Sequence, residues 1–290
     1  MPSLKQRAPQ QVKVLGRRAT VAAGQRTAGW RMEPAFVLAG GQRCGTTSLY
    51  RALMAHPEVL PPVHHKGVNY FDVHYDRGRD WYRAHFPLRS VAALRTRSSQ
   101  RPPVTFDASG YYMYHPHAAP RLGRDLPGVR VVVMLRDPVE RAWSAYKHEA
   151  ARGFETEPFE RALELEDERV EPELARLLAD PSAYSSTHRH HSYRRRGHYA
   201  EQLQRIVDAV GHERLHVVDS AAFFADPRTE FLRLTEFLGL SPALPHRFDQ
   251  WNARPGSQMP TRGERFLRAR LEEPDRELER FLGHPPGWRR

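Results

Sequence analysis

Hydroxyl, guanidinium and glycine residues stand together after a short apolar run, in an order that suits the binding of an anion. Residues 35–39 read AFVLA and are followed by Gly40 and Gly41. From Thr46 to Ala55 the apolar residues recur at helical spacing. A glycine turn between a strand and a helix presents unpaired backbone N–H groups at the positive end of the helix dipole. The segment therefore predicts a phosphate-binding loop.

This loop differs from the nucleotide-binding pattern G-x-x-x-x-G-K-[ST] at one decisive position. Gly40 and Gly45 match its two glycines, but Thr46 stands where the lysine belongs. The cation lies within the loop instead, at Arg43, where it would face the bridging oxygen of a phosphate-linked group. The change argues against an ordinary ATPase or kinase.

A second candidate anion site follows the strongest strand signal in the chain. Residues 129–135 read VRVVVML, and Arg136-Asp137-Pro138 comes directly after them. In an open α/β sheet, ligands bind beyond the carboxyl ends of the strands. Arg136 is expected at that edge, and Ser144 lies two turns into the helix that Pro138 opens. An arginine and a hydroxyl together suit a monoester phosphate.

The elements that position these motifs alternate between strand and helix. The apolar patterns predict strands at 35–39, 104–107, 129–135 and 215–218, and helices at 46–55, 116–126, 138–152, 193–210 and 231–237. Residues 155–180 read as a helical surface excursion. The alternation predicts an α/β domain over 35–290, P-loop-like, with three layers (α/β/α) around a central, mainly parallel sheet. Residues 1–34 are expected to be a flexible basic tail.

Composition and charge narrow the class of protein. The chain has 290 residues and a formal net charge of +11. Seven basic residues and one acidic residue give residues 1–34 a charge of +6. One cysteine, Cys44, excludes a disulfide framework within the chain and a Cys-rich zinc module. No apolar run approaches the ~20 residues of a membrane span, and no secretory signal is evident, so a cytoplasmic location is expected. We expect no metal, because His188, His190 and His191 lie among positive charges and read as a solvated or substrate-facing loop.

At these two motifs the sequence resembles a known family. The segment 41–49, GQRCGTTSL, looks like the 5'-phosphosulfate loop of the sulfotransferases, and 136–146 is similar to their 3'-phosphate motif. The likeness is greatest to the heparan-sulfate-type branch and its bacterial relatives, and runs from about 36 to 240. It implies a P-loop-like fold and metal-free transfer of a sulfuryl group from 3'-phosphoadenosine-5'-phosphosulfate (PAPS). The cofactor contacts that it implies are Gln42, Arg43, Cys44, Gly45, Thr46, Thr47 and Ser48 at the phosphosulfate, and Arg136 and Ser144 at the 3'-phosphate.

The resemblance also indicates which catalytic groups differ. Arg43 takes the place of the family's loop lysine, and Lys66 would face the sulfonate. The family's catalytic glutamate and the histidine after it are replaced by Gly67 and Asn69. The carboxylates that remain as candidates for the general base are Asp72 and Asp107, with His64 or His65 as alternatives. A late loop, 242–263, is the counterpart of a loop that closes over the nucleotide, with Trp251, Arg262 and Arg265 as its candidate contacts.

The sequence alone leaves two other functions open. A P-loop kinase or NTPase would use the same kind of loop, although Thr46 disfavours it. A non-enzymatic nucleic-acid-binding protein would use the basic residues 1–34, although no specific nucleic-acid motif is present. The expected partner is a small-molecule or carbohydrate acceptor, which the sequence does not specify further, and no membrane span is expected. The sequence does not decide the oligomeric state.

Overall fold

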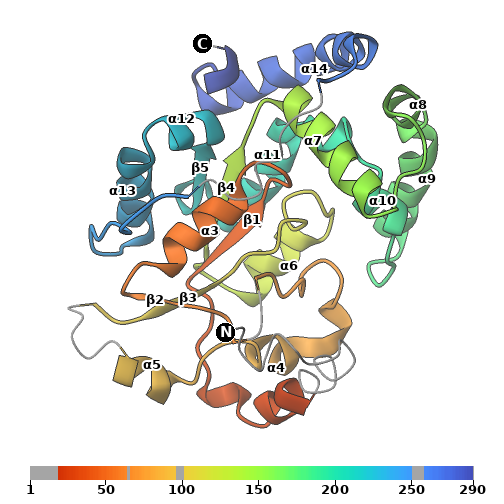
Figure 1. The fold of residues 1–290 in the computed structure, drawn as a ribbon. Coiled ribbons are helices and arrows are strands. Elements are labelled where there is room, and N and C mark those ends of the chain that lie inside the picture. The colour runs from red at the N-terminus through yellow and green to blue at the C-terminus, as the bar shows by residue number, and fades with distance from the viewer. Residues whose placement is uncertain (1–18, 64–65, 96–100, 250–257, 290) are drawn as a thin grey trace, which may run out of the picture.

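The computed structural model describes residues 19–63, 66–95, 101–249 and 258–289. Its described strands form one five-stranded sheet in which every pairing is parallel, in the order β2-β3-β1-β4-β5 (Figure 1). The strands are β1 (Phe36–Gly40), β2 (Val59–Leu60), β3 (Val104–Asp107), β4 (Arg130–Leu135) and β5 (Leu215–Asp219). The expected central parallel sheet is confirmed.

Helices connect these strands and cover the sheet. The α-helices are α3 (Thr46–Met54), α4 (Gly78–Arg83), α5 (Arg89–Arg95), α6 (Ala118–Asp125), α7 (Pro138–Ala151), α8 (Phe159–Glu164), α9 (Glu166–Ala179), α10 (Ser186–His190), α11 (Tyr199–Val210), α12 (Ser220–Ala225), α13 (Pro227–Leu238) and α14 (Thr261–Leu282). The 3₁₀-helices are η1 (Ala28–Trp30), η2 (Tyr75–Arg77), η3 (Arg195–Gly197), η4 (His212–Arg214) and η5 (Gly287–Arg289). None of the helices in the described ranges combines the length and apolarity that a membrane crossing requires.

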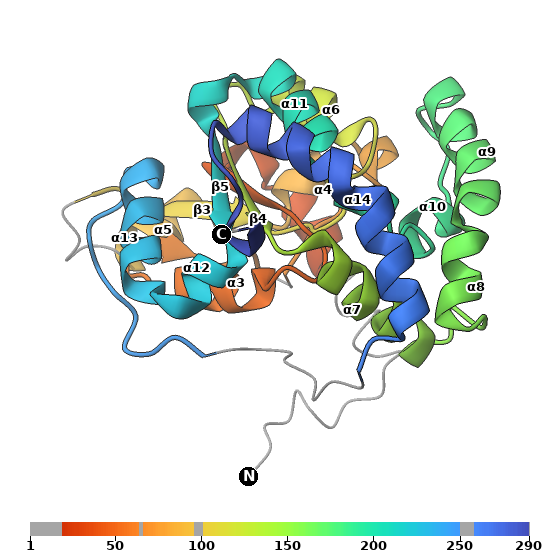
Figure 2. The same ribbon diagram turned by 90° about the horizontal axis from the view of Figure 1, so that it is seen from above.

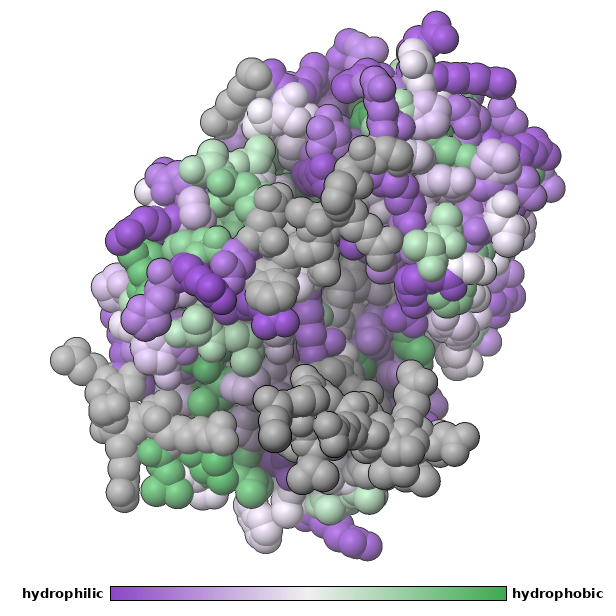
Figure 3. Space-filling view, in the orientation of Figure 1, coloured by the Kyte–Doolittle hydropathy of each residue, from purple (hydrophilic) through white to green (hydrophobic). Residues whose placement is uncertain are grey.

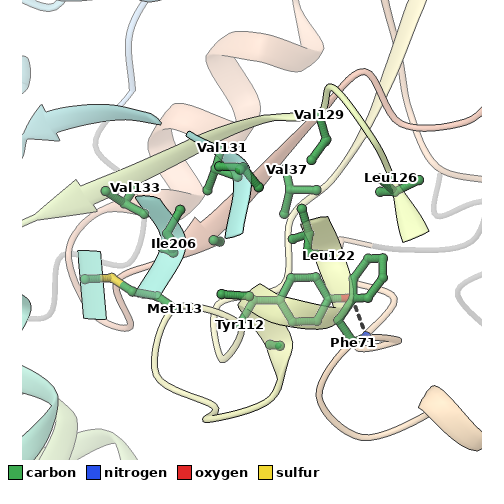
Figure 4. Packing of buried hydrophobic residues seen from close by; sticks show 14 of the residues in the cluster. Val37, Phe71, Tyr112, Met113, Leu122, Leu126, Val129, Val131, Val133 and Ile206 are labelled. Atoms are coloured by element: carbon green, nitrogen blue, oxygen red, sulfur yellow. Dashed lines mark hydrogen bonds between the residues drawn. The ribbon is translucent and has the colours of Figure 1, made fainter. Parts of the chain in front are cut away.

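Alternate residues of the central strands build a separate core on each face of the sheet. Val37 of β1 and Val131 of β4 pack on one face with α6 and α11, and Figure 4 shows this packing around Leu122 and Ile206. Leu38 and its neighbours pack on the other face with α3 and α13. Figure 2 shows the two groups of helices on opposite sides of the sheet. Both faces of the strands are covered, which is why these runs are almost continuously apolar.

The segment before β1 is attached to the domain from residue 19 onward. Val21 and Ala28 are buried. The Arg31 guanidinium donates to the carbonyl oxygen of Phe86, and the backbone N–H of Met32 donates to that of Pro87. The sequence predicted a flexible tail over 1–34, but residues of this segment form hydrogen bonds with the chain at 86–87. The division at residue 34 stays a prediction.

Figure 3 shows that the face seen in Figure 1 is mostly hydrophilic, with apolar surface at its lower edge, where α5 lies. Val91 and Leu94 of α5 are exposed there.

The segment 155–180, which was expected to be helical and to lie at the surface, contains α8 and α9. These helices lie at one edge of the molecule in Figure 2.

Candidate functional site

The first glycine loop lies at the carboxyl edge of the sheet, between β1 and α3. Gly45 precedes α3 in the left-handed region, at φ 94° and ψ 6°. This backbone conformation favours glycine, and a Cβ atom there would also lie 2.9 Å from the ring of Phe224. The backbone N–H of Gly41 donates to the carbonyl oxygen of Met134 at 2.8 Å and fixes the loop to β4. The loop therefore stands beside the start of the second motif.

A hydrogen bond joins the two predicted anion motifs directly. Nε of Arg43 donates to Oγ of Ser144 at 3.1 Å, although the two residues are 101 positions apart. Strands β1 and β4 are neighbours in the sheet, so their carboxyl ends bring the loop and α7 together. The structure thus brings a loop arginine into contact with a helix hydroxyl that the sequence had assigned to a separate anion site.

Arg136 lies at the same edge, and its guanidinium pairs with an acid. Nη2 lies 2.6 Å from Oε2 of Glu140, in the first turn of α7, and the Arg136 side chain is 38% exposed. Asp137 caps α7 by accepting from the backbone N–H of Val139 at 2.8 Å. The Tyr199 hydroxyl donates to the carbonyl oxygen of Arg136 at 2.9 Å and so fixes the backbone at this residue. A phosphate at this position would have to compete with Glu140 for the guanidinium.

Glu149 of α7 contacts the glycine loop through Gln42. Its Oε1 accepts from Nε2 of Gln42 at 3.1 Å, and its Oε2 lies 3.0 Å from Nδ1 of His190 and 3.2 Å from Nη1 of Arg152. The side chain is almost fully buried, which acts to raise the pKa of Glu149, but His190 and Arg152 together hold this pKa below its ordinary value. Sequence reasoning missed Glu149, because nothing in the local pattern of α7 separates it from the other polar residues of that helix.

The loop cysteine is inaccessible. Cys44 is fully buried, and its Sγ lies 3.9 Å from the Tyr199 hydroxyl and 3.7 Å from the carbonyl oxygen of Gln42. Burial raises the pKa of the thiol, so the sulfur is a poor nucleophile here. Ser48, in the first turn of α3, is also buried. Neither side chain is exposed at the loop surface, although the backbone of Cys44 belongs to the loop.

Lys66 reaches the loop from outside it. Its Nζ lies 3.4 Å from Oγ1 of Thr46 and 3.3 Å from Oγ1 of Thr47, the first two residues of α3. It also lies over the ring of Tyr50, 5.4 Å from the centroid. Burial lowers the pKa of Lys66 to about 8. The structure thus places the predicted sulfonate-facing lysine beside both loop threonines.

Asp107 is a buried anchor for the segment that carries Lys66. Its Oδ1 accepts from the Val68 backbone N–H at 3.1 Å and from the Ser109 hydroxyl at 2.8 Å. Its Oδ2 accepts from the Tyr112 hydroxyl at 2.7 Å and the Tyr82 hydroxyl at 3.4 Å. The carboxyl group is fully buried, which raises its pKa in spite of these donors. With four donors on two oxygens, this geometry favours a structural role over proton transfer.

Asp72 has a different environment. Its Oδ1 accepts from the Val73 backbone N–H at 2.6 Å, while the buried Oδ2 has no hydrogen-bond partner. Burial is the largest effect on this carboxyl group and raises its pKa to about 7, with the charge of Arg189 acting against the rise. An unpartnered carboxylate oxygen with such a pKa suits proton transfer near neutrality. The role of Asp72 stays a prediction, as does that of Asp107, and His64 and His65 lie outside the described residues.

The backbone explains why Gly67 carries no side chain. Its φ is +85°, and a Cβ atom would lie 2.9 Å from the carbonyl oxygen of Ala108 and 3.4 Å from Oγ of Ser109. Asn69 also has a positive φ, 54°, and its N–H donates to Ser109 Oγ at 2.9 Å. The path of this segment, and not only its side chains, departs from one that would present a glutamate at position 67.

The histidines of 188–191 do not form the solvated loop that their charged surroundings predicted. His188 is buried, stacks on Tyr114 at 4.4 Å and lies 2.6 Å from the Tyr111 hydroxyl through Nδ1. The buried Arg196 lies over the rings of Tyr111 and Tyr114, at 5.0 and 4.8 Å. Aromatic partners far away in sequence explain the difference. Among the described residues, no group of three or more His, Cys, Asp or Glu side chains is arranged to hold a metal ion.

A cavity of about 500 Å³ lies along α3, on the side of Ser48 and Arg51. The rings of Phe223, Phe224 and Phe248 line it as well. Phe224 is the ring that packs against Gly45, so the cavity adjoins the first turn of α3. In the late loop, Arg262 pairs with Glu164 at 2.9 Å, while Trp251 lies outside the described residues.

The chain is similar to several known proteins in sequence and in structure. A family model described as "Sulfotransferase family" matches residues 34–243. The bifunctional heparan sulfate N-deacetylase/N-sulfotransferase 3 of Homo sapiens is 28% identical over 218 residues, which are 72% of this chain and 22% of that protein. The membrane-associated sulfotransferase kil1 of Dictyostelium discoideum is 34% identical over 115 residues, 39% of this chain and 22% of that protein.

A solved structure resembles most of the fold. The crystal structure of a sulfotransferase from Alicyclobacillus acidocaldarius has a TM-score of 0.67 and 28% sequence identity, and the match covers 89% of this chain and 99% of that one. The chain spans less than a quarter of the length of the two curated relatives.

Proposed function

This chain belongs to the sulfotransferase family, and we propose on that premise that it moves a sulfuryl group from PAPS to a hydroxyl or amine. The observation that carries the proposal is the hydrogen bond from Arg43 to Ser144, which joins the 5'-phosphosulfate loop to the 3'-phosphate motif. A nucleotide with one phosphate at its 5' end and another at its 3' end needs two such anion sites side by side. A kinase is not favoured, because Thr46 replaces the lysine of its loop.

The residues present fit this co-substrate. Backbone N–H groups of the loop and the hydroxyls of Thr46 and Thr47 would bind the 5' end, at the positive end of α3. Arg43 would also reach the 5'-phosphosulfate from within the loop, and Arg136 and Ser144 would bind the 3'-phosphate by charge-assisted hydrogen bonds. When bound, PAPS supplies a sulfuryl group on a good leaving group. The cavity along α3 has the aromatic and basic lining that suits a purine nucleoside.

For the proton of the acceptor, we propose Asp72 ahead of Asp107. Asp72 keeps one carboxylate oxygen without a hydrogen bond, and its pKa is raised to about 7. Asp107 uses both oxygens to hold the segment around Val68. As acceptor we propose a carbohydrate first, since a heparan sulfate N-sulfotransferase is among the relatives, and a secondary-metabolite hydroxyl second. A cytoplasmic location and the lack of a metal requirement are also proposals.

Nucleotide binding tests the proposal. Isothermal titration calorimetry with 3',5'-ADP, PAPS and Mg-ATP should give binding of the first two and none of the third. Ser144→Ala and Arg136→Ala should each weaken 3',5'-ADP about 10- to 100-fold, as expected for a lost hydrogen bond to a charged group. Arg276→Ala is the matched control, because Arg276 also pairs with a glutamate one turn away, on α14, and belongs to neither anion motif.

The outcomes separate the alternatives. Tighter binding of Mg-ATP than of 3',5'-ADP would support a kinase or NTPase. If neither bisphosphorylated nucleotide binds at millimolar concentration, the proposal is wrong. Transfer itself is tested by incubating the enzyme and [³⁵S]PAPS with desulfated saccharides and with hydroxylated small molecules, followed by chromatography of labelled products.

A further inference from the structure

A buried carboxylate on α7 joins the glycine loop to α10. Oε1 of Glu149 accepts from Nε2 of Gln42 in the loop at 3.1 Å, and Oε2 lies 3.0 Å from Nδ1 of His190 on α10. Gln42 and His190 are 107 and 41 positions away from Glu149 in the sequence. Only 1% of the Glu149 side chain is exposed. The two oxygens of one buried group therefore contact two different elements.

The ionised form of this carboxylate fixes the orientation of its partner in the loop. Nη1 of Arg152, three residues further along the chain, lies 3.2 Å from Oε2. Burial acts to raise the pKa of Glu149, but His190 and Arg152 hold it below its ordinary value. A carboxylate accepts hydrogen bonds and donates none. Gln42 therefore turns its amide N–H₂ toward Glu149, so the orientation of this loop side chain is set from α7.

The element at the other end of this link also acts on the proposed base. Arg189 precedes His190 on α10, and its guanidinium lies 5.6 Å from the centroid of the Tyr111 ring. The charge of Arg189 lowers the pKa of Asp72 against the larger effect of burial. The ring of His190 stacks on that of Phe154, with 3.9 Å between centroids and 2° between planes. A displacement of α10 would therefore change the electrostatic surroundings of the proposed base.

We propose that Glu149 is a positioning residue for sulfuryl transfer, which holds the glycine loop and α10 in one arrangement through Gln42 and His190. The proposal rests on the proposed function and deepens it, because the loop would bind the donor while α10 carries a charge that acts on Asp72. Contiguous hydrogen bonds can carry such a coupling, and here they meet at one carboxylate. A nucleotide bound at the loop should therefore also stabilise α10.

Hydrogen–deuterium exchange of the ligand-free protein, followed by mass spectrometry, tests the link itself. Glu149→Met keeps the length of the side chain and removes both acceptor oxygens. Amide exchange should become about threefold faster or more in peptides that cover 40–46 and 186–191, because both segments lose a hydrogen bond. Glu155→Met is the matched control. The Glu155 side chain is also 1% exposed and pairs with Arg169 at 3.1 Å, and among the described residues its hydrogen-bond partners lie outside the loop and α10.

The sign of the change in nucleotide affinity separates positioning from simple charge. Glu149→Met removes a negative charge near an anion site, which by charge alone should strengthen the binding of 3',5'-ADP. Loss of positioning should instead weaken it about fivefold or more in isothermal titration calorimetry, as expected for a lost hydrogen bond. Glu149→Gln removes the same charge but keeps groups that can bond Gln42 and His190, so it should stay within about twofold of the wild type.

A second variant breaks the link from the side of α10. His190→Phe keeps a ring against Phe154 and removes the hydrogen bond to Glu149. It should weaken 3',5'-ADP about threefold, although His190 belongs to neither anion motif. This variant also decides the question if Glu149→Met does not fold, which thermal unfolding of every protein will show. In the wild type, 3',5'-ADP should slow the exchange of 186–191, and in His190→Phe it should not.

Two results would overturn the role of Glu149. One is binding of 3',5'-ADP by folded Glu149→Met or His190→Phe that is as tight as in the wild type or tighter. The other is exchange at 186–191 that Glu149→Met leaves unchanged, or that Glu155→Met changes equally. If the wild type binds no 3',5'-ADP while ligand-free exchange behaves as expected, the proposed function fails and the link between the loop and α10 remains. The two failures are thereby distinguished.

Discussion

Restoring a side chain at Gly67 should destabilise the protein rather than return a catalytic group to it. Gly67 has a φ of +85°, and a Cβ atom would lie 2.9 Å from the backbone oxygen of Ala108. Placing a non-glycine residue in the left-handed region costs about 1–2 kcal/mol. Overpacking against an atom that cannot turn away costs about 1–3 kcal/mol more. Gly67→Ala should therefore lower the free energy of unfolding by about 2–5 kcal/mol.

Gly283→Ala is the matched control. Gly283 ends α14 with a φ of 74° and ψ of 7°, and a Cβ atom there would meet nothing within 4 Å. This variant should show the backbone cost alone, about 1–2 kcal/mol. Urea unfolding at 25 °C, followed by tryptophan fluorescence, measures both variants, and thermal unfolding gives roughly 2–4 °C for each kcal/mol in a domain of this size.

Gly67→Glu extends the same test to activity. It should be at least as unstable as Gly67→Ala, and it should not increase transfer from PAPS. A Gly67→Ala protein no less stable than Gly283→Ala would refute the reasoning from the Ala108 contact. So would a Gly67→Glu protein that is as stable as the wild type and turns over faster, since the backbone would then present the glutamate after all.

Two buried carboxylates give further predictions. Asp107→Asn should lower the free energy of unfolding, measured in urea, by about 2–3 kcal/mol. The reason is that an amide N–H₂ would face donors such as Val68 N–H or the Tyr112 hydroxyl. A decrease under about 1 kcal/mol would contradict the anchoring role of Asp107. The pKa of Asp72 is raised from 3.8 to about 7 by burial, so the folded state favours the neutral acid. Below pH ~4 this preference contributes up to about 4 kcal/mol to the free energy of unfolding. The contribution is lost as the pH rises to about 7. The stability of Asp72→Asn should lack this decline, and parallel pH profiles for variant and wild type would exclude the effect.

Local pattern predicted the central elements well. The apolar residues before Gly40 and before Arg136 indicated β1 and β4, and Pro138 indicated the start of α7, because these signals act within a few residues. The pattern failed where distant partners decide burial. His188 reads as solvated from its charged neighbours, yet it is buried because Tyr111 and Tyr114 surround it from another segment.

The sequence by itself predicted two anion-binding motifs, since a glycine turn before a helix and an arginine after a buried strand are local features. Only the tertiary structure decided how these two motifs meet. Arg43 meets Ser144 across 101 residues and Lys66 meets Thr47 across 19. These contacts depend on which strands are neighbours and on the backbone path at Gly67. Apolar periodicity specifies which faces are buried, and it carries no information about which of two buried strands lies next to which.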